Sequence, residues 1–113
     1  AFAVRDPLVA KALCFISEHC DQPLKVADVA RGVSVSLRTL QRVFQEEDGL
    51  TIRTEIERFR VERLKRLLVQ TDRPVKDLAY AVGFRDAARM TKVFARAVGL
   101  SPTAYRKEHG RSR

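Results

Sequence analysis

Two stretches of this chain repeat one pattern: VADVARGVSVSLRTLQRVFQEEDGLT at residues 26–51 and VKDLAYAVGFRDAARMTKVFARAVGLS at residues 75–101. The copies are offset by 49 residues before their central turn and by 50 residues after it, so the second turn is one residue longer. The matching pairs are Val29-Ala30 with Leu78-Ala79, Phe44 with Phe94, Gly49-Leu50 with Gly99-Leu100, and Thr51 with Ser101. Such self-similarity predicts two equivalent structural units.

Each copy has the apolar spacing of a short helix, a turn and a longer helix. The helices are expected over residues 26–31 and 36–47 in the first copy, and over 75–82 and 86–98 in the second. Residues that favour helix ends stand nearby: Ser34, Ser36, Thr51 and Asp86 as N-caps, Gly32 and Gly83 as breaks, Gly49 and Gly99 as stops. This is the helix-turn-helix arrangement, whose second helix presents its N-terminal half to the major groove of DNA. A generic helical hairpin repeat is the alternative interpretation.

Three more helices are expected around the repeat. One runs over residues 6–20, with Asp6 as N-cap and a proline at the next position; another follows Thr51 to about Gln70; a last short helix spans about 102–108. No strand pattern is present. The sequence therefore predicts an all-α fold of about seven helices, divided into a first helix-turn-helix subdomain (1–50), a linker helix (51–71), a second subdomain (72–109) and a frayed tail (110–113).

The linker helix predicts a geometry for DNA. About 20 residues at roughly 1.5 Å each span about 30 Å, close to the roughly 34–36 Å between successive major-groove faces of B-DNA. One chain would then read two adjacent grooves without dimerising. Its apolar stripe predicts a core that bridges the two units, and its outer face is basic. The stripe is Ile52, Ile56, Phe59, Leu64, Leu67 and Leu68; the basic face is Arg53, Arg58, Arg60, Arg63, Lys65 and Arg66, with Glu55, Glu57 and Glu62 interspersed.

The charge of the chain is strongly asymmetric. Residues 1–50 hold six Lys and Arg against seven Asp and Glu (net −1), whereas residues 51–113 hold sixteen against seven (net +9), which gives the chain its +8. A compact basic domain of this size favours a polyanionic partner, most often nucleic acid. No secretory signal or membrane-spanning apolar run is present, so a cytoplasmic protein without a membrane partner is expected. The first residue is Ala1 rather than methionine, which favours a fragment of a longer protein.

Other classes of function have weaker support. Cys14, His19 and Cys20 are close in sequence, but no metal-ligand spacing is present, and one buried and one helix-terminal thiol are the simpler interpretation. No catalytic constellation or phosphate-binding loop stands out, so neither an enzyme nor a cofactor is predicted. The basic helix 51–70 leaves open a partner protein or a membrane surface. RNA is less favoured, because the aromatic residues are mostly at core spacing.

Several motifs resemble those of the AraC/XylS family of transcriptional regulators, over roughly residues 6–107. They are Gly83-Phe84, Phe94, Gly99, Pro102, Tyr105 and Arg106 in the second unit, Leu40-Gln41-Arg42-Val43-Phe44 and Gly49 in the first, and Arg60 with Leu67-Leu68 between them. The resemblance implies a seven-helix domain that binds double-stranded promoter DNA, in a regulator that is an activator and contacts RNA polymerase. It also implies a separate effector-binding or dimerisation domain, commonly N-terminal. The first residues are similar to sugar-responsive members such as the xylose type.

The chain departs from the family pattern at a few positions. Leu64 stands where the linker helix often has a small residue, and Arg89-Met90 replaces a frequent Tyr-Phe pair. Ala87 and Ala88 stand where polar, groove-facing side chains are frequent. These alanines predict that the second unit discriminates less between DNA sequences.

In the first unit, the resemblance places the base-contacting positions at Arg38, Gln41 and Arg42. Their spacing puts them on one helix face. Arginine can bond guanine O6 and N7, and glutamine can bond adenine N6 and N7. A solvated polar face, or contacts to phosphates alone, is the alternative.

In the second unit, the matching base-contacting positions are Ala88, Thr91 and Lys92. Alanine can contact a thymine methyl but carries little of the hydrogen-bonding code. Phosphate contacts, which are largely independent of sequence, are predicted for Ser36, Thr39, Thr51, Arg85, Arg89, Arg96 and Thr103. The first unit would thus specify the site and the second would mainly hold the DNA. The acidic trio Glu46-Glu47-Asp48 is expected to point away from the duplex.

Overall fold

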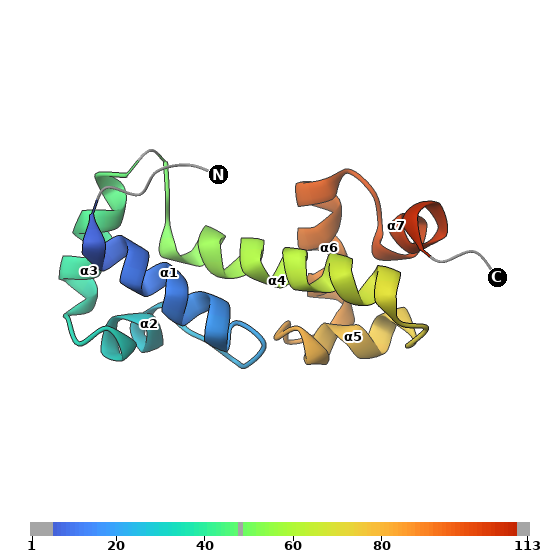
Figure 1. The fold of residues 1–113 in the computed structure, drawn as a ribbon, viewed down its shortest axis with the longest axis horizontal. Helices are drawn as coiled ribbons and strands as arrows, with labels where there is room; N and C mark the ends of the chain where they lie inside the picture. Colours follow the sequence, from blue (N-terminus) through green and yellow to red (C-terminus); the bar gives the residue numbers. More distant parts are fainter. Residues whose placement is uncertain (1–5, 48, 111–113) are drawn as a thin grey trace.

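A computed structural model of the chain describes residues 6–47 and 49–110. Seven helices and no strand are present in these residues, which confirms the predicted all-α class (Figure 1). The helices are α1 (Pro7–His19), α2 (Val26–Gly32), α3 (Leu37–Gln45), α4 (Ile52–Gln70), α5 (Val75–Ala81), α6 (Ala87–Val98) and α7 (Pro102–His109). None of the described helices is long and apolar enough to cross a membrane. The predicted tail residues 111–113 lie outside the described residues.

Side-chain N-caps explain where most of the helices begin. A hydroxyl or carboxylate of the capping residue accepts a backbone N–H of the first turn, which would otherwise lack a partner. The capping bonds are Leu8 N–H to Asp6 (2.8 Å), Thr39 N–H to Ser36 (3.1 Å), Thr54 N–H to Thr51 (3.1 Å), Arg89 N–H to Asp86 (2.7 Å) and Ala104 N–H to Ser101 (3.1 Å). The caps predicted at Asp6, Ser36, Thr51 and Asp86 are confirmed.

The turns of the two repeat units have the same backbone. In each, a left-handed residue follows the short helix, Ser34 (φ +62°) in the first and Gly83 (φ +99°) in the second. Val35 N–H donates to Ala30 O at 3.1 Å, and Phe84 N–H donates to Ala79 O at 2.9 Å. The offset of 49 residues therefore holds through Val35 and Phe84, and the extra residue of the second turn is Arg85.

The predicted break at Gly32 was wrong, because Gly32 is the last residue of α2 and Ser34 is left-handed instead. A glycine is required at position 32 because the Phe15 ring packs against its backbone: a Cβ there would lie 2.2–2.6 Å from three carbons of that ring. The predicted end of α3 was also wrong. The helix ends at Gln45 because Glu47 turns inward, where it is 8% exposed and accepts Asp6 N–H at 3.0 Å.

Two hydrophobic cores share the helix α4 (Figure 1). Ile52 and Ile56 belong to a core shared with α1–α3, and these helices with the first half of α4 are called the first subdomain from here on. Val61, Leu64 and Leu68 belong to a core shared with α5–α7, which with the second half of α4 form the second subdomain. At about 100° per residue, these two sets point roughly 130° apart around the helix axis. The prediction of one bridging stripe was therefore wrong in detail: the apolar surface of α4 changes face at its middle.

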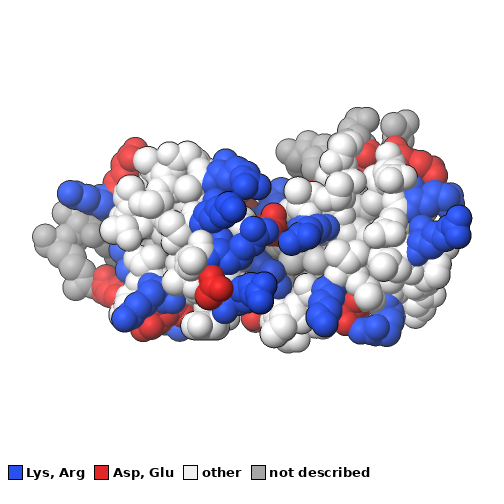
Figure 2. Space-filling view, turned by 180° about the vertical axis from the view of Figure 1, so that it is seen from behind, with Lys and Arg blue, Asp and Glu red and all other residues white. Residues whose placement is uncertain are grey.

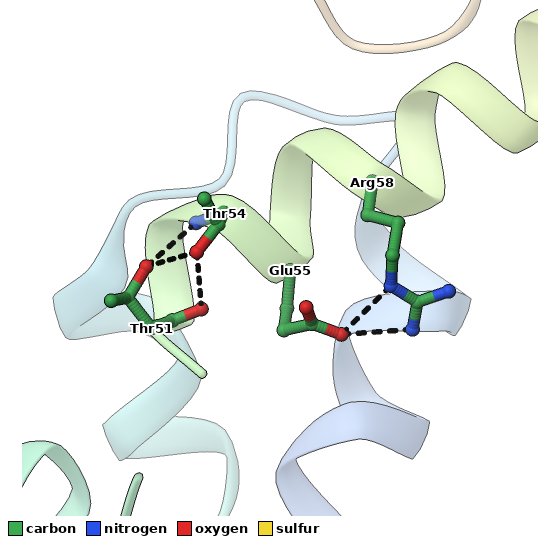
Figure 3. A network of polar contacts seen from close by, with 4 residues as sticks. All are labelled: Thr51, Thr54, Glu55 and Arg58. Atoms are coloured by element: carbon green, nitrogen blue, oxygen red, sulfur yellow. Dashed lines mark hydrogen bonds and ion pairs between the residues drawn. The ribbon is translucent and has the colours of Figure 1, made fainter. Parts of the chain in front are cut away.

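Glu55 also differs from its predicted place on the outer face of α4. It is buried, and its carboxylate accepts Arg58 Nε at 2.9 Å and pairs with Nη2 at 2.8 Å (Figure 3). A buried carboxylate is tolerated when such a charged partner satisfies it.

The molecule is elongated, with extents of 48 × 25 × 20 Å. Helix α4 runs along the long axis, with α1–α3 around one end and α5–α7 around the other (Figure 1). This arrangement separates the two longer helices of the repeat units, α3 and α6.

Candidate DNA-recognition surface

Helix α3 presents a continuous polar face. Its buried side is Leu40, Val43 and Phe44. On the opposite side the exposed Arg38, Gln41 and Arg42 line one shallow hollow together with Thr39 and Gln45. The residues selected from the sequence as base contacts therefore share one accessible surface.

Two residues of this surface were missed in the sequence. Gln45 extends the face one more turn, and its spacing of seven residues from Arg38 could have revealed it. Gln41 and Gln45 also border a second hollow, between α3 and the start of α4, that is lined by Thr51 and Arg53. Arg53 could not be assigned from spacing, because its place depends on how α4 packs against α3.

The acidic residues after α3 do not act as a group. Glu46 pairs with Arg42 at 3.2 Å, with both side chains exposed, so this carboxylate lies beside the polar face instead of pointing away from it. Glu47 is buried, and Asp48 lies outside the described residues. An exposed pair of this kind contributes little to stability, so Arg42 can exchange it for another acceptor.

Helix α6 presents a shorter and less polar face. Ala88, Thr91 and Lys92 are exposed at the positions equivalent to Arg38, Gln41 and Arg42. Ala87, in contrast, packs against the second core, as its equivalent Leu37 packs against the first. Only Ala88 of the two alanines therefore replaces a surface position.

The basic residues around α6 divide into two groups. Arg85 and Arg96 are exposed, as predicted for phosphate contacts, and neither they nor Lys92 has an ion-pair partner within residues 6–47 and 49–110. Arg89 is half-buried, and its guanidinium donates to Glu57 on α4. A phosphate contact by Arg89 therefore has to displace a carboxylate.

Three of the candidate phosphate ligands with hydroxyl groups, Ser36, Thr39 and Thr51, have internal partners. Ser36 Oγ accepts Thr39 N–H and donates to Thr39 Oγ1 at 2.9 Å. Thr51 contacts the N–H and the hydroxyl of Thr54 at the start of α4 (Figure 3). Thr103 is exposed in the first turn of α7, which is capped by Ser101.

Several arginines of the basic second half serve the fold. Arg60 was predicted on the outer face, but it is half-buried, and Nε and Nη2 donate to Cys20 O (2.8 Å) and Gln22 O (2.9 Å). Burial lowers the pKa of Arg60, and the guanidinium still stays charged at neutral pH. Arg106 donates to Leu68 O (3.0 Å), in the last turn of α4, and to Thr71 O (3.2 Å) and Arg73 O (2.6 Å), which follow that helix. These two arginines cap helix ends that are far from them in sequence.

The Lys and Arg side chains, taken together, form a visible pattern on the surface. Figure 2 shows the face behind α4, where blue side chains gather in the middle, around the place where the two subdomains meet. A further group lies at the outer edge of the first subdomain. The hollow between the subdomains is lined by five cationic and two acidic residues, Lys25, Arg53, Arg60, Arg85 and Arg89 with Asp21 and Glu57.

The two cysteines differ in their burial. Cys20, at the end of α1, is buried, and this burial raises the pKa of its thiol, whereas Cys14 is exposed. Across the part of the chain that the structure describes, no three His, Cys, Asp or Glu side chains gather as metal ligands would.

Two helix-turn-helix units on one shared helix, each with an accessible polar or basic face, define a DNA-binding domain of the double helix-turn-helix class. A family model described as "Helix-turn-helix domain" matches residues 29–108. The chain belongs to the AraC family of transcription regulators, and more specifically to its DNA-binding domains. This family is one of regulators and not of enzymes.

Relatives and solved structures agree with this assignment. The chain is 36% identical over 99 residues to the melibiose operon regulatory protein of Escherichia coli K12, which covers 88% of the chain and 33% of the relative. The C-terminal domain of AraT from Geobacillus stearothermophilus matches with a TM-score of 0.89 and 28% identity, over 98% of this chain and 93% of that one. The AdpA DNA-binding domain, solved in complex with a target DNA, matches with a TM-score of 0.82 and 32% identity, over 92% and 93%. The chain spans about a third of the length of the curated relatives it matches.

Proposed function

We propose that this domain binds promoter DNA as a monomer, with α3 and α6 in two successive major grooves on one face of the duplex. The observation that supports it best is that two equivalent helix-turn-helix units pack on the two halves of α4. The 19 residues of α4 at about 1.5 Å each give roughly 28 Å, near the groove repeat of about 34–36 Å. The proposed division into residues 1–50, 51–71 and 72–109 follows the same two units.

Sequence discrimination is assigned mainly to α3. Arg38, Gln41 and Arg42 share one hollow, and their side chains carry the donors and acceptors that read guanine and adenine edges. Gln45 extends the same face. Helix α6 contributes Ala88, Thr91 and Lys92, of which only the last two can hydrogen-bond, so its base preference is weaker.

Phosphate contacts are assigned to both subdomains and to the surface between them. Arg53 borders the hollow beside α3 and also the hollow between the subdomains, where Arg85 and Arg89 lie. It is therefore suited to the backbone strand that crosses from one groove to the next. The other phosphate ligands proposed are Ser36, Thr39, Thr51, Arg96 and Thr103.

The whole protein is proposed to be a transcriptional activator with a further effector-binding or dimerisation domain. Its relatives are about three times as long as this chain and include proteins named transcriptional activators, NphR of Rhodococcus and RhaS of Enterobacter. Contact with RNA polymerase belongs to the same proposal, and so does a place in the cytoplasm, where promoter DNA is.

Selection of duplexes from a random pool by the purified domain tests this function. We expect enriched sequences with two conserved boxes one helical turn apart, more tightly specified in the box protected by α3. A hydroxyl-radical footprint should show two protected grooves on one face. A single box, or no enrichment over a random duplex, would contradict the proposal.

A further inference from the structure

The middle of α4 is the point where the two subdomains meet. Between Ile56, in the first core, and Val61, in the second, lie four residues of α4; Phe59 packs against the first core, and the other three belong to neither core. A bend there would change the distance and the rotation between α3 and α6.

The side chain of Arg60 bridges this middle section. It donates to two carbonyls of the α1–α2 loop, Cys20 O at 2.8 Å and Gln22 O at 2.9 Å, and so holds α4 to the first subdomain. The same guanidinium lies over the ring of Phe84, 5.8 Å from its centroid, and Phe84 belongs to the second core. One cation thus contacts both subdomains from the helix that joins them.

The turn of the second repeat unit rests directly on the first subdomain. A Cβ on Gly83 would lie 2.0 Å from Cys20 O and 2.8 Å from Arg60 Nε. No other residue type fits at this distance without a shift of the backbone. The turn that positions α6 is therefore in contact with the loop that follows α1.

Two ion pairs reinforce the same region. Arg89 at the start of α6 donates to Glu57 on α4, and Arg63 on α4 pairs with Asp21 of the α1–α2 loop at 3.3 Å. All these contacts lie on the middle of α4, and they connect α6 to the first subdomain through it.

We propose that a set of contacts at the middle of α4, which we call the junction, fixes α6 relative to α3. The junction consists of the contacts of Arg60 with Cys20 O, Gln22 O and Phe84, and of the close contact of Gly83 with Cys20 O. The junction restricts the domain to DNA sites with one spacing between the two boxes. Arg60 is a positioning residue in this role, without contact to DNA. The proposal rests on the two-groove function above. One base pair added between the boxes moves the second box by about 3.4 Å and turns it by about 34–36°, which a rigid junction cannot follow.

The test compares the enriched site with sites that have one base pair added or removed between the boxes. We expect the wild-type domain to lose affinity steeply on both altered sites. We call the ratio of the affinity for the enriched site to the affinity for an altered site the spacing penalty. Arg60→Gln keeps most of the side chain but removes the charged guanidinium. In this variant the spacing penalty should fall by about fivefold or more, which is within the range of couplings measured in one contact network. A folded Arg60→Gln domain with the wild-type penalty would overturn the proposal.

Arg106→Gln is the matched control. Arg106 also donates to backbone carbonyls across a large sequence separation, but all its acceptors lie between Leu68 and Arg73, outside the junction. Its loss should lower stability and leave the spacing penalty at the wild-type value. If Arg60→Gln does not fold, Arg60→Lys keeps the charge and loses the fork, and a wild-type penalty in that variant overturns the proposal equally. Failure of the wild-type domain to bind any two-box site would instead contradict the proposed function.

Discussion

The two repeat units have the same turn and different surfaces. Val35 and Phe84 close equivalent hydrogen bonds behind equivalent left-handed residues. Beyond the turn, α3 exposes a continuous row of polar side chains, whereas α6 exposes Ala88 at the equivalent place and has Arg89 paired with α4. The backbone of the motif is thus constant, and the side chains of each unit determine what it does.

The turns themselves also differ in what surrounds them. Ser34 is exposed, whereas Gly83 touches the backbone of the other subdomain. The turn of the first unit therefore faces solvent, whereas the turn of the second unit is in contact with the other subdomain. This difference leads to four predictions, ordered from the largest expected effect to the smallest.

The largest effect is expected from exchanging the two turn residues. Gly83→Ser introduces the residue that the first turn tolerates, so the cost of a left-handed non-glycine residue, about 1–2 kcal/mol, is the same in both turns. The clash with Cys20 O adds to it, and we expect a loss of more than about 3 kcal/mol in the free energy of unfolding. Ser34→Gly should change stability by less than about 1 kcal/mol. Urea unfolding measures both, and similar changes would show that the close contact at Gly83 is unimportant.

The second prediction concerns the polar face of α3, to which we assign the base contacts. Arg42→Ala should cost about 1–3 kcal/mol in binding of the enriched site, confined to one base position, with little change on a random duplex. Binding isotherms on both duplexes measure this, with Arg66→Ala, an exposed arginine of α4, as control. Unchanged specific binding would remove Arg42 from the base-contacting set.

A smaller and less selective effect is expected at the equivalent residue of α6. Lys92→Ala should weaken binding to all sequences alike and flatten the slope of log K against log salt by about one. Titrations at several salt concentrations, on the enriched site and on a random duplex, measure the slope. A loss confined to the enriched site would mean that Lys92 discriminates between bases as strongly as we propose for Arg42, and that the two units are more alike than we propose.

The smallest effect concerns the ion pair that ties α6 to α4. Glu57→Gln removes the carboxylate that competes with phosphate for Arg89, so affinity for a random duplex should rise by less than about 1 kcal/mol. The salt slope should steepen by up to about one if Arg89 then reaches a phosphate. An unchanged slope would leave Arg89 with a purely structural role. Glu62→Gln, beside Lys65 on the same helix, is the control.

Most of the fold could be predicted from the sequence because the local signals agree. The helix starts followed from capping residues such as Thr51 and Asp86, and the repeat identified the units. The errors arose where long-range contacts decide. Nothing local to Gly32 indicates that Phe15 packs on it, and the change of face in α4 requires knowing that Ile56 and Val61 belong to different cores.

The candidate site could be predicted in outline for the same reason. Helical spacing placed Arg38, Gln41 and Arg42 on one face, and the structure gives them a common hollow. Spacing could not separate arginines that serve the fold from those free to bind DNA. Arg60 is a basic residue like Arg53 in the sequence, and only the distant carbonyls of Cys20 and Gln22 distinguish it.

The shared helix also limits how this domain can change its operator during evolution. A residue inserted into α4 turns one unit about 100° relative to the other and lengthens the helix by about 1.5 Å. A base pair inserted into DNA turns the second box by only about 34–36° and adds about 3.4 Å. Because the rotation and the rise per residue of the α-helix differ from those per base pair of DNA, a longer α4 cannot adapt the domain to a DNA site with a longer spacing. Regulators built this way must instead diversify by substituting side chains on α3 and α6.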